Sequence, residues 1–407
     1  MRISIAVLAL FSILIGCRET EEGNNLAEGM WRVELDVMDH QELPFNLKVD
    51  KSVDGNYTMQ IFNAEEVIHV DEIVIKGDSI IMPTPVFEGY LAGTFTEKEI
   101  NGQFITESLD RIVPFKAVYG IEDRFTLNTE ATEWNVSGIW ETYFSPELPE
   151  EYIGKGIFLQ DKNRVTGTFR TTTGDYRYLD GVLDGDSLKL SAFDGAHAFL
   201  FTAKVTDSTI NGIFYSGNHF KEPFVAVRND GFELPDPDSL TYLKEGYDKL
   251  AFTFPDANGN MVSLDDEKYR DKVVVVQLMG TWCPNCLDET KFLVSYLEDN
   301  QNLEVIGLAF ESAKTKEIAI KGINRLKKRI GVNYPILLAQ FGSYDKQAAQ
   351  EKLPMLNHVL SYPTTIFIDK KGQVRKIHTG FNGPATGAKY VEFQKDFKAF
   401  ITQLNKE

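Results

Sequence analysis

The pattern of hydrophobic and polar positions changes character part-way along the chain. In the first half, short runs rich in β-branched and aromatic residues, such as Tyr57–Phe62, Val70–Ile75 and Arg164–Phe169, alternate with turn sequences such as Asp54–Asn56 and Asp184–Asp186. Short runs of this composition bounded by turns indicate strands joined as antiparallel hairpins. We therefore predict that the first half of the chain is entirely β.

The β-rich half contains an internal repeat. Gly29–Trp31 recurs as Gly138–Trp140, and three further motifs recur in the same order at nearly the same spacing. Such self-similarity predicts two copies of one unit, at residues 29–128 and 138–230. A unit of about 100 residues holds roughly six to eight strands, enough for a small barrel or sandwich.

The Gly-x-Trp opening of each copy is similar to that of lipocalin-type barrels, a resemblance that implies architecture only. Trp31, Trp140 and their aromatic neighbours either line a ligand cavity or docking surface, or fill the cores of structural barrels. We favour the second interpretation because small barrels need large side chains inside. The histidines of this half lack metal-ligand spacing, so no metal site is predicted there: His40, His69, His197 and His219.

After a proline-containing linker at residues 231–245, the pattern becomes that of alternating strands and helices, at residues 246–407. Val273–Met279 is a continuous apolar run, typical of a central strand covered on both faces. A helical segment follows from the cysteines to Tyr296, and a second apolar run spans Leu303–Ala309. This order predicts a βαβ unit, and the composition of Leu234–Ser239 within the linker predicts an extended, solvated connector.

Cys283 and Cys286 lie where the first of these strands gives way to the helix. A thiolate at a helix N-terminus is stabilised by free backbone N–H groups, which would make Cys283 the nucleophile. Pro284 suits the first helical turn, where its missing N–H needs no partner. Cys286 lies on the same face and can resolve a mixed disulfide formed by Cys283. The spacing therefore favours a reversible dithiol–disulfide couple.

Other roles for the cysteine pair are less favoured. A zinc site needs about four ligands, but no second cysteine pair is present, and His358 and His378 are isolated. A purely structural disulfide would close a very short loop and stabilise little. We therefore predict a redox pair that uses no metal and no cofactor.

Residues of about 250–405 resemble the TlpA/ResA-like branch of the thioredoxin family. The resemblance rests on the hairpin sequence Phe254–Gly259, on Gly280–Cys286 after an apolar strand, and on Tyr362–Thr365 at the start of another strand. It implies a thioredoxin-like α/β fold and thiol–disulfide oxidoreductase activity. The expected fold class is multidomain: two tandem antiparallel all-β units, lipocalin-like barrels or sandwiches, followed by a thioredoxin-like domain.

The resemblance also implies roles for particular residues. Pro363 is expected to be cis and to lie opposite the cysteines, where Trp282, Tyr362 and Pro363 contact substrate. Glu289 matches a glutamate that this branch uses near the cysteine pair. If it is buried, its pKa is raised and it can exchange protons with Cys286. The alternative is an ordinary solvated carboxylate on the helix surface.

Two features depart from a minimal thioredoxin. Gln277 stands six residues before the first cysteine, where thioredoxins proper place a buried Asp. Residues 311–360 also exceed what the fold requires. Within them a helix is expected at Ala313–Ile330, a strand at Tyr334–Ala339 and a second helix at Tyr344–Leu353. This insertion either shapes partner choice or simply adds structure.

The N-terminus has the pattern of an export signal. A charged start, an apolar stretch from Ile3 to Ile15 and a small residue after it predict a signal peptide at residues 1–16. Leu14–Cys17 is similar to a bacterial lipobox, which implies a lipidated Cys17 and a tether at residues 17–28. An ordinary secretory signal is the alternative. The expected location is the cell envelope, lipid-anchored on the periplasmic side or at the outer-membrane surface.

Charge and cysteine content narrow the function. A formal net charge of −18 argues against nucleic-acid binding, and the basic run Arg325–Arg329 is interpreted as a solvated helix face. If Cys17 is lipidated, the mature chain keeps only Cys283 and Cys286. With no further cysteines for structural disulfides, this pair is expected to be functional.

The leading hypothesis is an enzyme that reduces disulfides of exported proteins through its Cys-Pro-Asn-Cys dithiol. Its partners would be protein disulfides or dithiols and a membrane or periplasmic electron donor. One alternative is a ligand- or protein-binding surface lipoprotein in which the β domains are the main functional part. The other is a thiol peroxidase, which is less favoured because peroxiredoxins carry Thr-x-x-Cys, whereas Thr281 stands two residues before Cys283.

Overall fold

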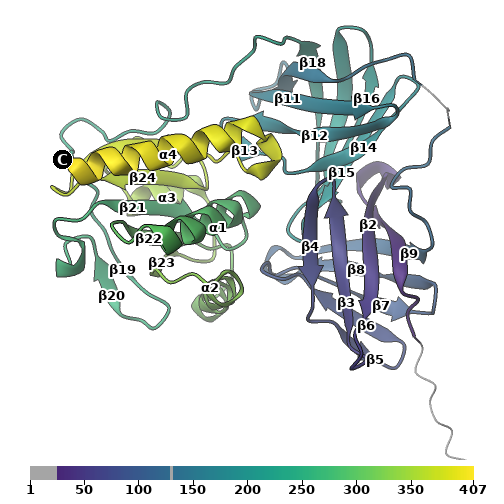
Figure 1. Ribbon diagram of the computed structural model, residues 1–407, viewed down its shortest axis with the longest axis horizontal. Helices are drawn as coiled ribbons and strands as arrows, with labels where there is room; N and C mark the ends of the chain where they lie inside the picture. Colours follow the sequence, from purple (N-terminus) through teal and green to yellow (C-terminus); the bar gives the residue numbers. More distant parts are fainter. Residues whose placement is uncertain (1–24, 129–131) are drawn as a thin grey trace, which may run out of the picture.

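A computed structural model describes residues 25–128 and 132–407. The predicted signal peptide, Cys17 and most of the predicted tether lie outside the described residues. Within these two ranges, no helix is long and apolar enough to cross a membrane. Two β units and an α/β domain follow one another along the chain (Figure 1). The predicted fold class is therefore confirmed.

The first β unit is an open, nine-stranded antiparallel sheet with the order β4-β3-β2-β1-β9-β8-β7-β6-β5. Neighbouring strands in this order are mostly consecutive in the chain, as expected for hairpins. The elements are β1 (Gly29–Asp36), η1 (Met38–His40), β2 (Glu42–Lys51), β3 (Tyr57–Asn63), β4 (Glu66–Val70), β5 (Val74–Lys76), β6 (Ser79–Pro83), β7 (Tyr90–Phe95), β8 (Glu99–Thr106), η2 (Glu107–Leu109) and β9 (Arg111–Tyr119).

The second β unit closes on itself. Its strand order is β11-β10-β18-β17-β16-β15-β14-β12-β13, and an additional pairing of β11 with β12 joins β10, β11, β12 and β14–β18 into a barrel. The strands are β10 (Gly138–Phe144), β11 (Tyr152–Asp161), β12 (Arg164–Thr171), β13 (Gly174–Asp175), β14 (Leu179–Asp184), β15 (Ser187–Phe193), β16 (Ala198–Val205), β17 (Thr209–Ser216) and β18 (Phe220–Arg228).

The two units place their tryptophans alike. Trp31 and Trp140 are fully buried. Each indole N–H donates to the backbone carbonyl four residues earlier, that of Ala27 at 3.0 Å and that of Val136 at 2.8 Å. The interpretation that Trp31 and Trp140 fill the β cores is confirmed.

The first unit stays open because the second unit completes its core. Phe193, Leu200 and Tyr215 of the barrel belong to the same buried cluster as Phe45. The rings of Phe45 and Phe193 stack with centroids 4.4 Å apart. These barrel side chains fill the space that a closed first sheet would enclose, so the two copies pack differently despite their shared pattern.

The α/β domain has a central sheet with the order β23-β22-β21-β24-β25. Strands β21, β22 and β23 run parallel to one another, β24 runs antiparallel to β21, and β25 runs antiparallel to β24. β21 is buried along its whole length, as its continuous apolar run predicts. The elements are β19 (Thr253–Pro255), β20 (Met261–Ser263), η3 (Glu267–Tyr269), β21 (Val274–Met279), α1 (Pro284–Asp299), β22 (Glu304–Phe310), α2 (Lys316–Ile330), β23 (Ile336–Gln340), α3 (Lys346–Lys352), β24 (Thr364–Ile368), β25 (Val374–Thr379), η4 (Pro384–Thr386) and α4 (Ala388–Lys406).

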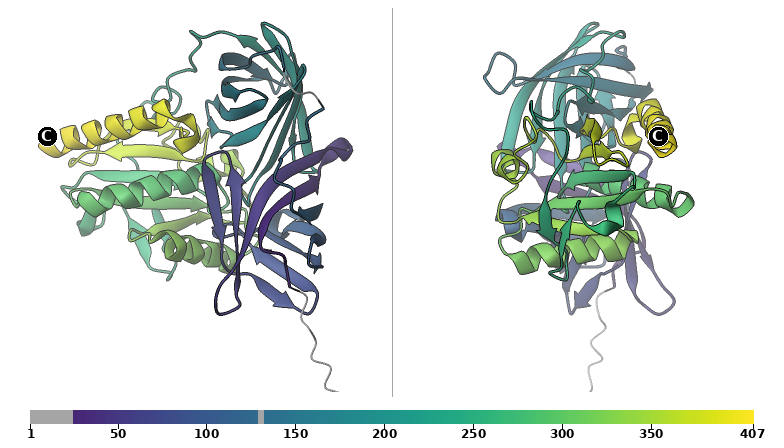
Figure 2. Two further views of the ribbon diagram at one scale, coloured as in Figure 1. Left: turned by 45° about the vertical axis from the view of Figure 1, so that its right-hand side comes forward. Right: turned by 90° about the vertical axis from the view of Figure 1, so that its left-hand side faces the viewer.

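The α/β domain lies against both β units (Figures 1 and 2). On helix α2, Arg329 pairs with Asp71 at 2.8 Å and Arg325 with Glu72 at 2.7 Å. The interpretation of this basic run as a solvated face is therefore wrong for these two arginines. Strand β4 ends just before the acidic pair and β5 begins after it, so the run Val70–Ile75, predicted as one strand, is interrupted.

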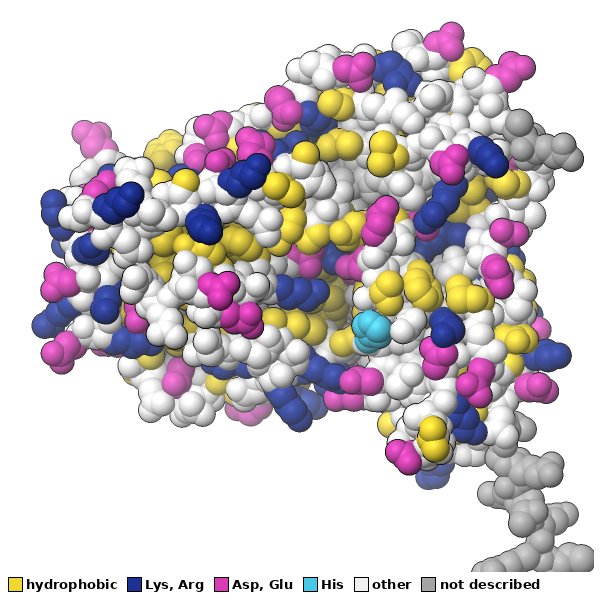
Figure 3. Space-filling model, in the orientation of Figure 1, with side chains coloured by type: hydrophobic (Ala, Val, Ile, Leu, Met, Phe, Trp, Pro, Cys, Tyr) yellow, Lys and Arg dark blue, Asp and Glu magenta, His cyan; other side chains and the backbone are white. Residues whose placement is uncertain are grey.

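The linker also packs on the α/β domain. Leu243 forms a β-bridge with Leu356, and Thr241 is buried, with its hydroxyl 2.8 Å from that of Thr379. The packed residues follow Leu234–Ser239, the stretch predicted as a solvated connector, which contains no buried residue. In Figure 3, hydrophobic side chains are visible between the α/β domain and the β units, and charged side chains of both signs lie among them and over the rest of that face.

Candidate active site

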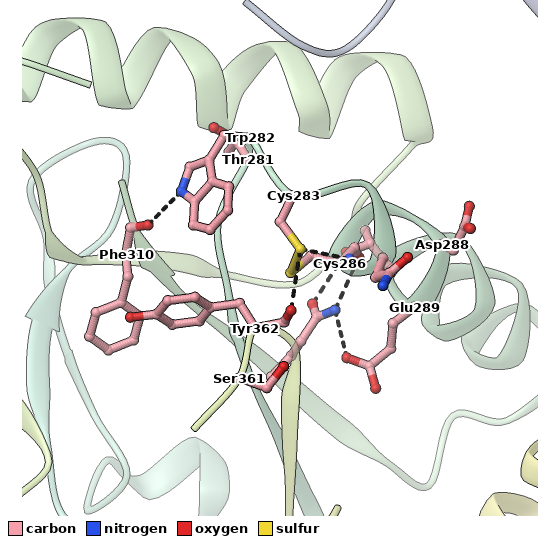
Figure 4. Close-up of a disulfide and its surroundings, with 12 residues drawn as sticks. Thr281, Trp282, Cys283, Cys286, Asp288, Glu289, Phe310, Ser361 and Tyr362 are labelled. Carbon is pink, nitrogen blue, oxygen red and sulfur yellow. Dashed lines mark hydrogen bonds between the residues drawn. A yellow bond between two sulfur atoms is a disulfide. The ribbon is translucent and has the colours of Figure 1, made fainter. Parts of the chain in front are cut away.

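The cysteine pair occupies the junction between strand β21 and helix α1. Cys283 is the N-cap of α1, and its sulfur accepts a hydrogen bond of 3.1 Å from the backbone N–H of Cys286. The two residues are joined by a disulfide (Figure 4). Cys283 is 6% exposed, whereas Cys286 is fully buried. Only Cys283 is therefore open to an incoming sulfur atom.

The loop before β24 lies opposite the cysteines. The Tyr362–Pro363 peptide bond is cis, as the family resemblance implied. The carbonyl oxygen of Tyr362 lies 3.5 Å from the sulfur of Cys283. Trp282 donates its indole N–H to the carbonyl of Phe310 at 2.9 Å and meets the ring of Tyr362 edge-on (Figure 4). These contacts bring Trp282, Tyr362 and Pro363 to the disulfide.

Glu289 is buried one turn beyond Cys286. Gln277 donates from the same amide nitrogen to Glu289 at 2.8 Å and to the carbonyl of Cys286 at 3.2 Å. The hydroxyl of Thr365 donates to the other carboxylate oxygen. Burial raises the pKa of Glu289 to about 7, although the two hydrogen bonds oppose this shift. The alternative of a solvated helix carboxylate is therefore wrong.

A second buried carboxyl group, which the sequence analysis missed, lies on the other side of the cysteines. Glu311 accepts from the backbone N–H of Thr281 at 2.8 Å and from its hydroxyl at 2.6 Å. Burial raises the pKa of Glu311 to about 7 as well. The glutamate thus holds the turn that leads into Trp282 and Cys283. Its position directly after an apolar strand was the only signal in the sequence.

The second β unit reaches the redox motif through its β12–β13 hairpin, a contact that the sequence did not predict. The side-chain amide of Asn285, between the two cysteines, donates to the carbonyl of Asp175 at 3.1 Å. Ser361, in the loop before Pro363, donates to the carbonyl of Thr173 at 2.7 Å. The hairpin therefore touches both segments that surround the disulfide.

A buried ionic cluster joins all three structural units. Arg177 follows this hairpin and contacts Glu66 of the first β unit and Asp288 on helix α1, and its guanidinium is 3.7 Å from Asp194. All four side chains are largely buried. Since isolated buried charges are costly, Arg177 contributes charge compensation to all three carboxylates, and His197 and Lys291 supply further partners for Asp194 and Asp288.

The disulfide opens into a cleft of about 770 Å³ between the barrel and the α/β domain. Cys283, Trp282 and Tyr362 line it on one side, and aromatic residues of the barrel line the other. Among the described residues, no group of three or more His, Cys, Asp or Glu side chains is placed to hold a metal ion.

Comparison with known proteins places the α/β domain in a family. Residues 247–377 match the AhpC/TSA family. The thioredoxin-like protein YneN of Bacillus subtilis is 28% identical over 139 residues, which cover 34% of this chain and 73% of YneN. The thiol-disulfide oxidoreductase ResA of Geobacillus kaustophilus is 27% identical over 131 residues, covering 32% of this chain and 66% of ResA.

Among solved structures, a thiol:disulfide interchange protein of the thioredoxin family from Chlorobium tepidum is similar, with 18% identity and a TM-score of 0.30, over 40% of this chain and 98% of that one. On the sequence matches, the C-terminal domain of this chain belongs to the TlpA/ResA-like thioredoxin family of thiol–disulfide oxidoreductases.

Proposed function

We propose that this protein is a lipid-anchored, extracytoplasmic oxidoreductase that reduces disulfides of exported proteins with Cys283 and Cys286. The observation that carries the proposal is the position of the pair: a disulfide at a helix N-terminus, opposite cis-Pro363, with one sulfur open to a cleft. A disulfide that serves only to stabilise the fold needs no such opening.

The proposed cycle begins with both cysteines reduced. The thiolate of Cys283 attacks one sulfur of the substrate disulfide, so that a mixed disulfide forms, the substrate S–S bond breaks and one substrate thiolate leaves and takes up a proton. The thiolate of Cys286 then attacks the sulfur of Cys283, which forms the enzyme disulfide and releases the second substrate thiol. Two electrons pass to the substrate, and a dithiol donor must restore the enzyme.

Glu289 is the proposed proton carrier for Cys286. Cys286 must lose its proton before it can attack, and it is fully buried, so bulk water cannot readily take that proton. A carboxyl group with a pKa of about 7 suits this exchange near neutral pH. Gln277, which bonds both residues, keeps the carboxylate beside the second cysteine.

The reduction potential of the Cys283/Cys286 couple tests the proposed direction. A reductant is expected near thioredoxin, at about −270 mV, whereas a strong oxidant such as DsbA lies near about −120 mV. Equilibration of the full chain with glutathione or dithiothreitol buffers measures this value. A potential near −120 mV would overturn the proposed reductase in favour of an oxidase.

The anchor is tested separately from the chemistry. Replacing Cys17 with Ser should release the protein from the membrane fraction of a bacterium that processes lipoproteins, while purified protein keeps its dithiol activity. Retention of the C17S variant in the membrane fraction would contradict lipid anchoring at this residue.

The match to the AhpC/TSA family favours thiol peroxidase activity as a second candidate. Against it, the hydroxyl of Thr281 donates to Glu311 at 2.6 Å, and is thus committed away from any peroxide bound at Cys283. We expect no peroxide consumption by the purified, reduced protein beyond that of a C283S variant. Rapid consumption of peroxide that depends on Cys283 would support thiol peroxidase activity instead.

A further inference from the structure

The β12–β13 hairpin restricts access to the disulfide. Gly174 packs so closely on Asn285 that a β-carbon built on it would lie 2.2 Å from the side-chain nitrogen of Asn285. Gly380 packs on the hairpin in the same way, because a β-carbon built on it would lie 2.9 Å from the backbone of Thr173. The hairpin therefore covers the side of the redox motif on which Asn285 lies, and a substrate reaches Cys283 through the cleft.

The barrel gives this cleft an aromatic wall. Tyr176 packs edge-to-face on Phe214 with centroids 5.1 Å apart, and its hydroxyl lies 2.6 Å from that of Tyr152. Phe220 stands at the rim and is 45% exposed. All four line the same cleft as Cys283. An apolar side chain beside the reacting sulfur would be buried against this wall.

The cleft also carries positive charge in a chain of net charge −18. Arg111, at the start of β9, and Lys346, at the start of α3, both line it. Neither forms an ion pair with a carboxylate of the described residues. Burial lowers the pKa of Arg111, because no carboxylate offsets its loss of solvent. Two cations without anionic partners beside a redox pair favour an anionic ligand.

None of the other titratable groups facing the cleft forms an ion pair with Arg111 or Lys346. The carboxylate of Asp175 accepts from the backbone N–H groups of Gly383 and Arg177, at 2.7 and 2.8 Å. His197 lines the cleft and is paired with Asp194, which lies outside the cleft lining. His219 adds no further positive charge at neutral pH, since burial and the neighbouring Arg111 lower its pKa to about 4.

Two polar atoms at the cleft have no partner. The side-chain oxygen of Asn285 and the hydroxyl of Tyr362 are buried, and neither has a hydrogen-bond partner among the described residues. Buried polar atoms are nearly always bonded in folded proteins. The amide oxygen of Asn285 requires a donor such as a backbone N–H, and the Tyr362 hydroxyl can donate to a carbonyl. A polypeptide backbone supplies both groups.

We propose that the cleft binds a disulfide carried by an extended, acidic polypeptide segment that has an apolar residue beside its cysteine. Its carboxylates face Arg111 and Lys346, its apolar side chain lies on the aromatic wall, and its backbone pairs with Asn285 and Tyr362. The size of the cleft, about 770 Å³, suits a few residues rather than a folded domain. The inference rests on the proposed disulfide reductase and makes the second β unit part of its substrate site.

Three peptide disulfides of equal length test the charge preference, with Glu, Gln or Lys flanking a Leu-Cys sequence. We expect the reduced full-length protein to show kcat/KM about tenfold higher for the acidic than for the basic peptide at low ionic strength, with the gap narrowing in salt. In the R111Q/K346Q variant, the ratio of kcat/KM for the acidic peptide to that for the basic peptide should approach one, chiefly because the two KM values become similar. K395Q, which removes an exposed lysine of α4, should keep the wild-type ratio.

A second arm tests the aromatic wall. F220A should raise KM several-fold for the acidic Leu-Cys peptide but not for the matched Gly-Cys peptide. L159A removes a side chain that is 71% exposed elsewhere on the barrel, and it should leave the KM values for both peptides unchanged. Equal KM values for wild type and F220A with the Leu-Cys peptide would overturn the role of the barrel.

The remaining outcomes separate the inference from the proposed function. If the three peptides react equally, or if R111Q/K346Q keeps the preference, the inference falls while disulfide reduction stands. If oxidised glutathione reacts as fast as the acidic peptide, an extended segment is not what the cleft selects. If neither the peptides nor hydroxyethyl disulfide is reduced, the proposed function itself falls.

Discussion

Asn285, which stands between the two cysteines, donates a hydrogen bond of 3.1 Å to the backbone carbonyl of Asp175 in the second β unit. A residue of the redox motif is thereby held by a unit that lies more than a hundred positions earlier in the chain. The barrel is therefore part of the surroundings of the disulfide, and is more than a spacer ahead of the α/β domain.

Substituting Gly174 with Ala should disturb the redox site from within the barrel. The new β-carbon would collide with the side chain of Asn285, and the backbone at Gly174 has φ of +147°. Because small displacements at a reacting centre are costly, we expect kcat/KM for disulfide reduction to fall on the order of tenfold to a hundredfold.

The matched control for this change is G55A. Gly55 also has positive φ, at +82°, but nothing lies within 4 Å of a built β-carbon. It should lose some stability through backbone strain and keep its reduction kinetics. Equal losses of kcat/KM in G174A and G55A would show that strain alone, and not contact with the redox motif, is responsible.

Removing the charge of Arg177 should destabilise the whole assembly. R177Q leaves Glu66, Asp194 and Asp288 without their shared cation, and breaking a buried ion pair in this way costs about 3–5 kcal/mol. R164Q is the control, because Arg164 pairs with Asp180 at the surface, where such pairs contribute about 1 kcal/mol or less. Chemical denaturation of both variants measures the difference. A loss below about 1 kcal/mol in R177Q would contradict the importance of the cluster.

The fold could be predicted well where one pattern sufficed. The run Val273–Met279 and the cysteine motif specify a buried strand followed by a helix. Helices α2 and α3 lie within the segments expected of the insertion, and β23 overlaps its expected segment but ends one residue later. The difference between the two β copies could not be predicted. It depends on Phe193 and Leu200 of one copy packing into the core of the other, a long-range contact that leaves no local signal.

The same limit applies to the site. Cys283 and Cys286 follow from their motif, whereas the position of Pro363 and the candidate role of Glu289 came from the family resemblance, which left the burial of Glu289 open. The β12–β13 hairpin accepts hydrogen bonds from Asn285 and Ser361 through backbone carbonyls, which any sequence can supply. Their contribution to the site therefore becomes visible only when the three units are seen together.

Changing Glu289 to Gln should alter the pH dependence of turnover. With a pKa of about 7, Glu289 can take the proton of Cys286 only once it is ionised, so the wild-type rate should rise across this pH range. In E289Q that rise should be absent and turnover slower. E311Q, which removes another buried carboxyl group with a pKa of about 7, should keep the rise. An unchanged profile in E289Q would remove Glu289 from the mechanism.

Glu289 should also affect stability with a definite sign. An unfolded glutamate ionises near 4.5 but the buried one near 7, so between these values the folded state holds more protons. The free energy of unfolding should therefore decrease as pH rises from about 4.5 to 7 and level off above. This decrease should be smaller in E289Q, by on the order of 3 kcal/mol. Identical pH dependence in both proteins would contradict the raised pKa.

Trapping with Cys286→Ser tests the central claim most directly. If Cys283 attacks and Cys286 resolves, the reduced C286S variant should accumulate a mixed disulfide between Cys283 and an acidic peptide disulfide, detectable as an added mass that dithiothreitol removes. C283S should trap nothing, since its remaining cysteine is fully buried. Adduct formation in C283S and none in C286S would contradict the assigned roles, and its absence from both variants would contradict disulfide exchange at this site.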